Sequence, residues 1–124
     1  MTGSMEIVKA FSFEAAHHFE HMPEGHGYKR LHGHSYQVEV AIAGAPDPAT
    51  GWIADFGQVE TALDGIKEQL DHHLLNEVAG LANPSLENIA IWIAGALQET
   101  FRGISWVRVS RPSCAESCTY RIAA

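Results

Sequence analysis

The chain has 124 residues, of which 46% are hydrophobic and 19% are charged, as is typical of a single folded domain over residues 1–124. Its formal net charge of −7 argues against nucleic acid as a partner, because an acidic surface repels a phosphate backbone. No apolar run approaches the roughly 18 residues of a membrane-spanning helix, and we find no signal-peptide pattern. We therefore expect a cytoplasmic protein with no membrane partner, whose residues 1–4 form a flexible leader.

The first part of the chain predicts two strands joined by a loop. Residues 7–17 are rich in β-favouring residues and predict the first strand. Residues 20–30 contain proline and glycine and predict the loop. In residues 31–43 the even positions from Tyr36 to Ile42 are apolar, which predicts a second strand with one buried face.

A first helix is predicted after Asp55, which has the properties of an N-cap, and Gln58 three residues later would complete a capping box. Apolar residues then recur at spacings of three and four, as on one face of a helix. These residues are Phe56, Val59, Leu63, Ile66 and Leu70.

A second helix is predicted after Ser85 as N-cap, with Gly103 at its end. Its apolar stripe consists of Leu86, Ile89, Ile93, Leu97 and Phe101.

Residues 104–111 and 117–122 predict two closing strands around a short turn. The order ββααββ favours an α+β fold with a four-stranded antiparallel sheet and two helices on one face. Such a sheet has two edges and an open face that need cover, so we expect the subunit to associate with others.

Histidine is the compositional anomaly, because six of the eight histidines lie between His17 and His34. His32 and His34 alternate on the second predicted strand and therefore share the apolar face of Tyr36. His17 is in phase with Phe13 on the first strand, and an antiparallel neighbour would bring it to the pair. Three imidazoles around zinc leave a fourth position open, as in catalytic sites. The alternative is that these are ordinary hydrogen-bonded histidines.

Asp71 and His72 follow the first predicted helix. An aspartate beside a histidine can orient the imidazole and support its charged form, which suits a proton relay. The alternative is a helix C-terminus that favours histidine for its dipole.

The two cysteines, Cys114 and Cys118, are interpreted as reduced strand residues. A lone pair of cysteines at this spacing lacks the second pair that a structural zinc site needs, and no secretory context favours a disulfide.

Several short segments occur in order along nearly the whole chain: FEAAH at 13–17, PEGH at 23–26, RLHGHS at 30–35, LDHHL at 70–74 and CTYR at 118–121. Together they resemble the 6-pyruvoyl-tetrahydropterin synthase family. The match is closest to its bacterial branch, the 6-carboxytetrahydropterin synthases of queuosine biosynthesis.

This resemblance implies a T-fold subunit that forms a homo-oligomer, either a trimer or a hexamer. It implies Zn²⁺ on His17, His32 and His34, and it assigns Asp71 and His72 as the pair that activates the family's catalytic thiol. The implied substrate is the pterin 7,8-dihydroneopterin triphosphate. In the family the metal polarises the side-chain hydroxyls, a base removes protons from carbon, and triphosphate leaves; the bacterial branch also releases acetaldehyde.

Two positions depart from the family pattern. Tyr28 stands in place of the catalytic cysteine, and a phenol, with a reference pKa near ~10 against ~8.5 for a thiol, is a poorer base. Pro112 stands where the family has the glutamate that grips the pterin, and proline offers no side-chain acceptor. Glu116 is a substitute anchor from the turn, although turn carboxylates are commonly just solvated.

The sequence therefore predicts a zinc-dependent lyase on a pterin-like or purine-like small molecule, with Tyr28 as an acid, a base or only a wall of the site. One alternative is a zinc-containing T-fold protein that binds a heterocycle or a partner subunit without turnover. Another is an enzyme of altered substrate that uses the zinc-bound water as its nucleophile. The losses at Tyr28 and Pro112 motivate the first of these alternatives, and the second lies between it and the lyase.

Overall fold

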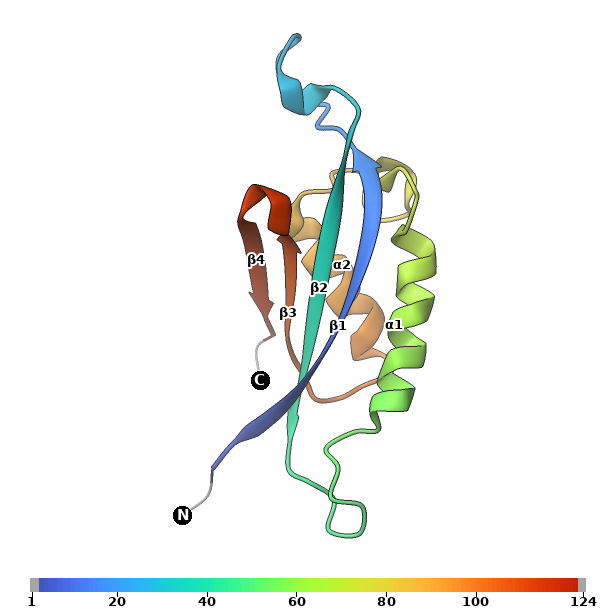
Figure 1. Cartoon of the computed structure of the whole chain (residues 1–124), viewed down its shortest axis with the longest axis vertical. Helices are drawn as coiled ribbons and strands as arrows, with labels where there is room; N and C mark the ends of the chain where they lie inside the picture. Colours follow the sequence, from blue (N-terminus) through green and yellow to red (C-terminus); the bar gives the residue numbers. More distant parts are fainter. Residues whose placement is uncertain (1–2, 123–124) are drawn as a thin grey trace.

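The structure is a computed structural model that describes residues 3–122, so the predicted leader over residues 1–4 lies partly outside the described residues. Four strands form one antiparallel sheet in the order β1-β2-β3-β4, and two helices pack on one of its faces (Figure 1). This confirms the predicted α+β architecture. The elements are β1 (Met5–His17), η1 (Gly27–Lys29), β2 (His32–Gly44), α1 (Phe56–Leu70), η2 (Leu75–Glu77), α2 (Leu86–Gln98), β3 (Ile104–Arg111), η3 (Pro112–Cys114) and β4 (Glu116–Arg121).

The two long strands β1 and β2 pair along their whole length, from Met5 opposite Gly44 to His17 opposite His32. The alternation of apolar residues sets this register, because a slip by one residue would turn the apolar set towards solvent. Phe13 and Tyr36 face each other in the core and stack with their ring centroids 4.8 Å apart.

The core lies between the sheet and the two helices. Asp55 begins α1 by accepting a hydrogen bond from the Gly57 amide at 2.8 Å, and Ser85 begins α2 by accepting one from the Asn88 amide at 3.1 Å. The predicted caps are therefore confirmed. The helix residues buried against the sheet are Val59, Leu63, Ile66, Leu70, Leu86, Ile89, Ala90, Ile93, Ala94 and Leu97.

Three details of the helix predictions are wrong. Phe56 is 48% exposed rather than buried, because α1 starts there, before the buried stripe that begins at Val59. The reciprocal capping-box bond from Gln58 is absent from the hydrogen bonds of residues 3–122. Helix α2 ends at Gln98, before Gly103.

The hairpin of β3 and β4 is closed by a short 3₁₀ turn. Strand β3 ends at Arg111 because Pro112 has no N–H for the ladder, and Ala115 then adopts the left-handed conformation with φ 55°. The prediction that Cys114 is a strand residue is therefore wrong, whereas Cys118 lies in β4 as predicted. Both thiols are free, as the sequence indicated.

Strands β1 and β4 form the two edges of the sheet. The segment after α1 contacts the outer side of β1 through a short parallel bridge between Ala16 and Leu74. No helix within residues 3–122 combines the length and the apolar character that crossing a membrane requires.

Candidate functional site

The register of β1 and β2 brings three histidines together at one end of the sheet. His17 and His32 are direct cross-strand partners, and His34, two residues further along β2, shares their face. One ligand nitrogen from each ring lies within 4.8 Å of the other two. The structure therefore places the three predicted metal ligands in a single cluster.

In each ring of this cluster, the Nδ1 atom has a neighbour outside the cluster. His17 Nδ1 donates to the Pro84 carbonyl oxygen at 3.3 Å, and His32 Nδ1 donates to the Arg30 carbonyl oxygen at 2.7 Å. Because a carbonyl oxygen only accepts, the proton sits on Nδ1 and the Nε2 lone pair stays free. The Nε2 atom of His17 is buried and has no hydrogen-bond partner within residues 3–122, so a metal ion fits this cluster.

Burial favours the neutral form of two rings in the cluster, His17 and His34. The His17 side chain is fully buried, and this burial lowers its pKa to about 4, with the neighbouring histidines adding to the effect. Burial is also the main cause of the lowered pKa of His34. Neutral imidazoles are the form that binds metal, so this environment favours coordination at neutral pH.

The Nδ1 atom of His34 faces a sulfur atom, whereas those of His17 and His32 face carbonyl oxygens. Its Nδ1 lies 3.8 Å from the Cys114 sulfur in the turn η3, which sequence reasoning did not associate with the site. A metal ligand is usually oriented by an outer hydrogen bond of this kind. The spacing of residues could not reveal the contact, because it depends on how the β3–β4 turn folds over β2.

Asp71 and His72 form a pair directly after α1. His72 Nδ1 lies 3.0 Å from Asp71 Oδ2, and the other Asp71 oxygen accepts from the Glu14 amide of β1 at 2.9 Å. That backbone hydrogen bond is the main cause of the lowered pKa of Asp71, so the carboxylate is charged at neutral pH.

The His72 backbone is held in an uncommon conformation. Its φ is 58°, and its amide donates to the Glu14 carbonyl oxygen at 2.6 Å. Strained backbone of this kind is concentrated at functional sites. The His72 side chain remains 75% exposed, so the pair is anchored to the edge of β1 while its imidazole faces solvent.

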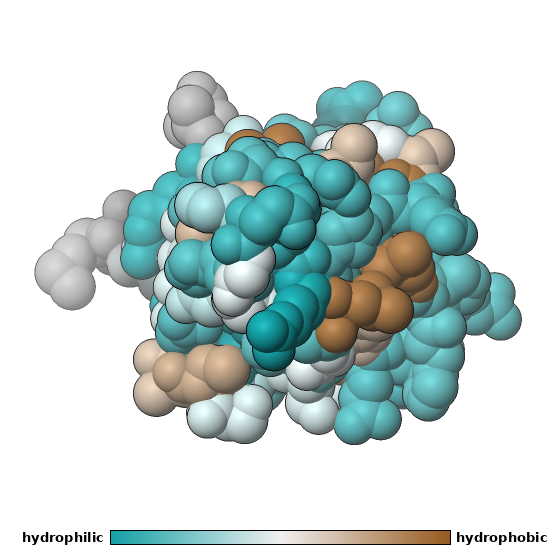
Figure 2. All heavy atoms as spheres, turned by 90° about the horizontal axis from the view of Figure 1, so that it is seen from above, coloured by the Kyte–Doolittle hydropathy of each residue, from teal (hydrophilic) through white to brown (hydrophobic). Residues whose placement is uncertain are grey.

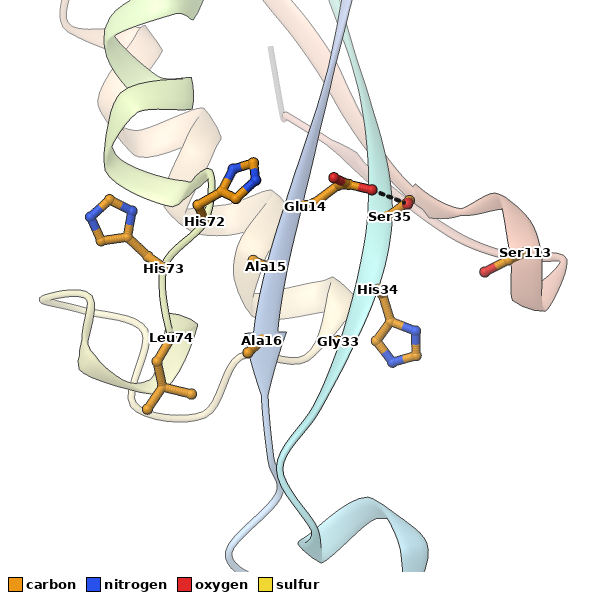
Figure 3. A pocket seen from close by; sticks show the side chains of 10 residues that line it. All are labelled: Glu14, Ala15, Ala16, Gly33, His34, Ser35, His72, His73, Leu74 and Ser113. Atoms are coloured by element: carbon orange, nitrogen blue, oxygen red, sulfur yellow. Dashed lines mark hydrogen bonds between the residues drawn. The ribbon is translucent and has the colours of Figure 1, made fainter.

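A broad hollow of about 660 Å³ crosses β1 and β2 and is lined by both His34 and His72 (Figure 3). In that view the two imidazoles lie on opposite sides of the strand pair, and Glu14 accepts a hydrogen bond from Ser35 at 3.0 Å between them. One chain thus brings the cluster and the pair to a common hollow but not into contact.

A second cavity, of about 640 Å³, lies beside the cluster and is lined by Tyr28, His32 and His34. Tyr28 is 54% exposed, and it does not line the hollow that contains His72. Seen from the end of the molecule that carries η1, which contains Tyr28, the surface is mainly hydrophilic with small separate apolar patches (Figure 2). This character suits a polar ligand.

The C-terminal hairpin supplies the remaining polar groups of this second cavity. Arg111 and Glu116 both line it, with Arg111 Nη2 3.1 Å from Glu116 Oε1. The structure thus places Glu116 near Tyr28, whereas Pro112 is not among the residues that line the cavity. Sequence reasoning missed Arg111; its strand parity, shared with the buried Val107 and Val109, was the available signal.

The profile of the family described as 6-pyruvoyl tetrahydropterin synthase matches residues 6–123. A 6-carboxy-5,6,7,8-tetrahydropterin synthase of Synechocystis is 43% identical over 98 residues, covering 75% of this chain and 74% of that protein. A dihydroneopterin monophosphate aldolase of Pyrococcus furiosus is 34% identical over 97 residues, covering 78% of each chain.

A solved structure shows the same fold. The 6-pyruvoyl tetrahydropterin synthase of Caenorhabditis elegans superposes with a TM-score of 0.84 at 21% identity, covering 98% of this chain and 97% of that one. The T-fold architecture implied by the sequence resemblance is therefore confirmed.

Proposed function

We propose that this chain, which belongs to the 6-pyruvoyl tetrahydropterin synthase family of pterin-processing enzymes, is a zinc-dependent lyase of the 6-carboxytetrahydropterin synthase type. Its proposed substrate is 7,8-dihydroneopterin triphosphate or a related pterin. The observation that carries the proposal is the cluster of three histidines in which the buried His17 Nε2 has no hydrogen-bond partner within residues 3–122. Three imidazoles leave a fourth position for a ligand.

His17, His32 and His34 would hold the zinc ion. When bound, the ion supplies Lewis-acid polarisation of the ligand's oxygen atoms. The chain's contribution is to gather three rings, two of which are oriented by the carbonyl oxygens of Pro84 and Arg30. This preorganisation supports tight metal binding.

His72 is the proposed proton-transferring group, and Asp71 orients it. Because the Asp71 carboxylate faces Nδ1, the Nε2 atom of His72 remains available to take up or return a proton. Histidine is the side chain most often used for general acid–base catalysis. His72 and His34 line the same hollow, so a ligand there would face both imidazoles.

Tyr28 takes the place of the family's cysteine in this proposal. A phenol has a reference pKa near ~10 and donates a proton at neutral pH more readily than it accepts one. We therefore assign Tyr28 as an acid beside His32 and His34, with which it shares a cavity. Removal of a proton from carbon then depends on His72 alone.

The same substitution favours a second candidate, aldol cleavage of the side chain. Aldol cleavage begins with loss of a hydroxyl proton, and a weaker base can remove a hydroxyl proton than a proton on carbon. The similarity to the protein named dihydroneopterin monophosphate aldolase, at 34% identity, also supports this candidate. Its product would be a shortened pterin together with a two-carbon phosphorylated aldehyde.

The third candidate is binding of a heterocycle without turnover, and the loss of the pterin-gripping glutamate at Pro112 motivates it. Glu116 is the carboxylate that lines the cavity of Tyr28. The Glu116 carboxylate is already paired with Arg111. This favours a role in holding Arg111 over a role in anchoring the pterin.

We further propose a cytoplasmic homo-oligomer, a trimer or a hexamer. The outer sides of β4 and of the first part of β1 carry backbone groups that a neighbouring subunit can pair, whereas the last part of β1 is bridged by the segment after α1. A second copy would also cover the exposed His72 imidazole. Light scattering should report such an oligomer at micromolar concentration, and a monomer would contradict this assembly.

Incubation of the zinc-loaded protein with 7,8-dihydroneopterin triphosphate tests the function, with products followed by mass spectrometry. We expect triphosphate release about 10²–10⁴-fold slower than by a cysteine-bearing relative, because a well-matched acid–base group contributes about that factor. A phosphorylated two-carbon aldehyde without triphosphate release would assign the aldolase reaction instead.

The double variant Tyr28→Cys with Pro112→Glu is the matched test of the two departures. Recovery of triphosphate release would show that the rest of the family site is intact. Turnover by the unmodified chain as fast as that of the double variant would contradict the roles assigned to these positions. Absence of any product from both proteins, with zinc still bound, would favour the binding candidate.

A further inference from the structure

Two buried side-chain nitrogen atoms in residues 3–122 have no hydrogen-bond partner: His17 Nε2 and Arg111 Nε. Buried polar atoms are nearly always paired, so each exception needs an explanation. A metal ion explains His17 Nε2. Arg111 Nε carries a hydrogen and can only donate, so the partner that it lacks is an acceptor.

Arg111 stands at the cavity beside the metal cluster. It is the last residue of β3, its side chain is only 15% exposed, and it lines the cavity together with His32 and His34. Burial is the main reason why the pKa values of His17 and His34 are lowered, and the Arg111 charge adds to both effects. The guanidinium therefore lies within electrostatic reach of the metal ligands.

The ion pair with Glu116 does not by itself explain this placement. Arg111 and Glu116 are direct partners in the β3–β4 register, and the contact at 3.1 Å engages one end of the guanidinium. A pair that served only to stabilise an exposed hairpin would gain little and would not need a largely buried cation. The guanidinium also interacts with the Tyr36 hydroxyl, but its Nε hydrogen has no partner within residues 3–122, so this donor remains for another acceptor.

The charge balance of the cavity points to the class of that acceptor. Arg111 is the only permanent cation among the residues that line the cavity, in a chain whose formal net charge is −7. An anionic ligand is repelled by the chain as a whole and needs a fixed positive charge at its site. Arginine is the side chain whose planar fork matches a phosphate group.

We propose that Arg111 is a specificity-determining residue that binds the phosphate ester of the ligand beside the metal cluster, while Glu116 holds the guanidinium in place until the phosphate arrives. This rests on the proposed function, because the side chain of a dihydroneopterin phosphate carries hydroxyl groups followed by a phosphate. The hydroxyl oxygens would then face the histidine cluster and the phosphate would face Arg111.

Binding of glycerol 3-phosphate to the zinc-loaded protein tests this assignment, because that compound reproduces a phosphorylated three-carbon chain without the pterin. Calorimetric titration should give an affinity at least about 10-fold higher than for glycerol, the scale of a charge-assisted hydrogen bond. Arg111→Met should remove this advantage, and Arg111→Lys should keep part of it. Zinc content, measured in parallel, should stay unchanged in both variants.

Arg108→Met is the matched control. Arg108 lies on the same strand, contacts Glu39 and Thr119, and does not line the cavity. We expect it to bind glycerol 3-phosphate with wild-type affinity, within about 2-fold. Glu116→Gln provides a test that does not depend on the folding of Arg111→Met, because release of the guanidinium from its ion pair should strengthen binding by several-fold.

Wild-type affinity in a folded Arg111→Met protein would overturn the proposal, as would an equal loss in Arg108→Met. Tighter binding of D-glycerate than of glycerol 3-phosphate would show that Arg111 prefers a carboxylate to a phosphate ester, and would overturn the proposed ligand class. These affinities do not depend on turnover, so a failure of the lyase assignment would be recognised separately by the absence of pterin products.

Discussion

The three-histidine cluster and the Asp71–His72 pair are positioned by different parts of the chain. The side chains of the cluster project from paired strands into the helix-covered side of the sheet, and His17 is fully buried. The pair follows a helix and is attached to β1 through the backbone of Glu14, with an exposed imidazole. One chain therefore completes the surroundings of the cluster, whereas the surroundings of the pair remain open for a ligand or a second subunit.

The largest effect is expected from breaking the cluster. The double variant His32→Ala with His34→Ala should retain no zinc, because one imidazole cannot hold the ion without the others. Metal analysis after purification without chelator should give about one zinc per wild-type chain and none in the variant. His21→Ala, which changes an exposed loop histidine, should keep the metal. Stoichiometric zinc in the double variant would remove the cluster as the metal site.

Changing the pair should leave the metal in place and alter turnover. Asp71→Asn keeps the shape of the side chain but removes the charge that orients His72, so kcat should fall by about 10²–10⁴-fold. Zinc content should not change. Asp64→Asn, at an exposed position of α1, is the control and should leave kcat unchanged. Loss of zinc from Asp71→Asn would show that the two regions are not separate.

The two regions should also respond to different ranges of pH. In the metal-free protein His17 has a pKa of about 4 when folded and 6.5 as its ordinary value, so between these values only the unfolded chain takes up the proton. The free energy of unfolding should therefore fall as pH decreases from 6.5 to 4, by up to about 3 kcal/mol.

The Asp71 contribution has the same sign, because it is also lost on acidification, but it is lost at lower pH. Its folded pKa is lowered from 3.8, so its stabilising effect is present above that value and is lost as pH falls below it. Denaturant unfolding at a series of pH values should show two separate windows. His17→Gln should flatten the upper window only, and an unchanged upper slope would contradict the assignment to His17.

The smallest effect is expected at Cys114, the outer neighbour of His34. Cys114→Ala should weaken zinc binding by about 10-fold, the lower end of the range for such outer neighbours of metal ligands. Competition with a chelator measures the affinity. Cys118→Ala is the control, since Cys118 lies in β4 and does not line the cavity beside the cluster. Equal affinities for the two variants would show that the sulfur does not support His34.

The cluster could be predicted from sequence because its geometry follows from strand parity. His32, His34 and Tyr36 occupy alternate positions, and His17 is in phase with Phe13, so pairing of the two strands is sufficient to gather the rings. The helix stripes could be predicted for the same reason, except at Phe56, where α1 starts beyond the buried core.

The contributions of the C-terminal hairpin could not be predicted in the same way. Arg111 obeys strand parity too, but two helices separate β2 from β3, so the sequence does not reveal which end of β3 meets the cluster. Cys114 approaches His34 only because Pro112 starts a 3₁₀ turn that folds the chain over β2. These contacts depend on which residues of β3 pair with β2, and an alternating pattern fixes which face of a strand is buried but not an offset by two residues.

The hydrogen bond from His17 to the Pro84 carbonyl oxygen affects the order in which the metal site is completed during synthesis. All three histidines lie within the first 34 residues, so the ribosome releases the β1–β2 hairpin, with its full set of metal donors, long before Pro84. Metal capture by the nascent hairpin would therefore precede the docking of α2, whose first turn follows Pro84 directly. We expect zinc to bind the nascent chain weakly at first and more tightly once this late segment locks the His17 ring.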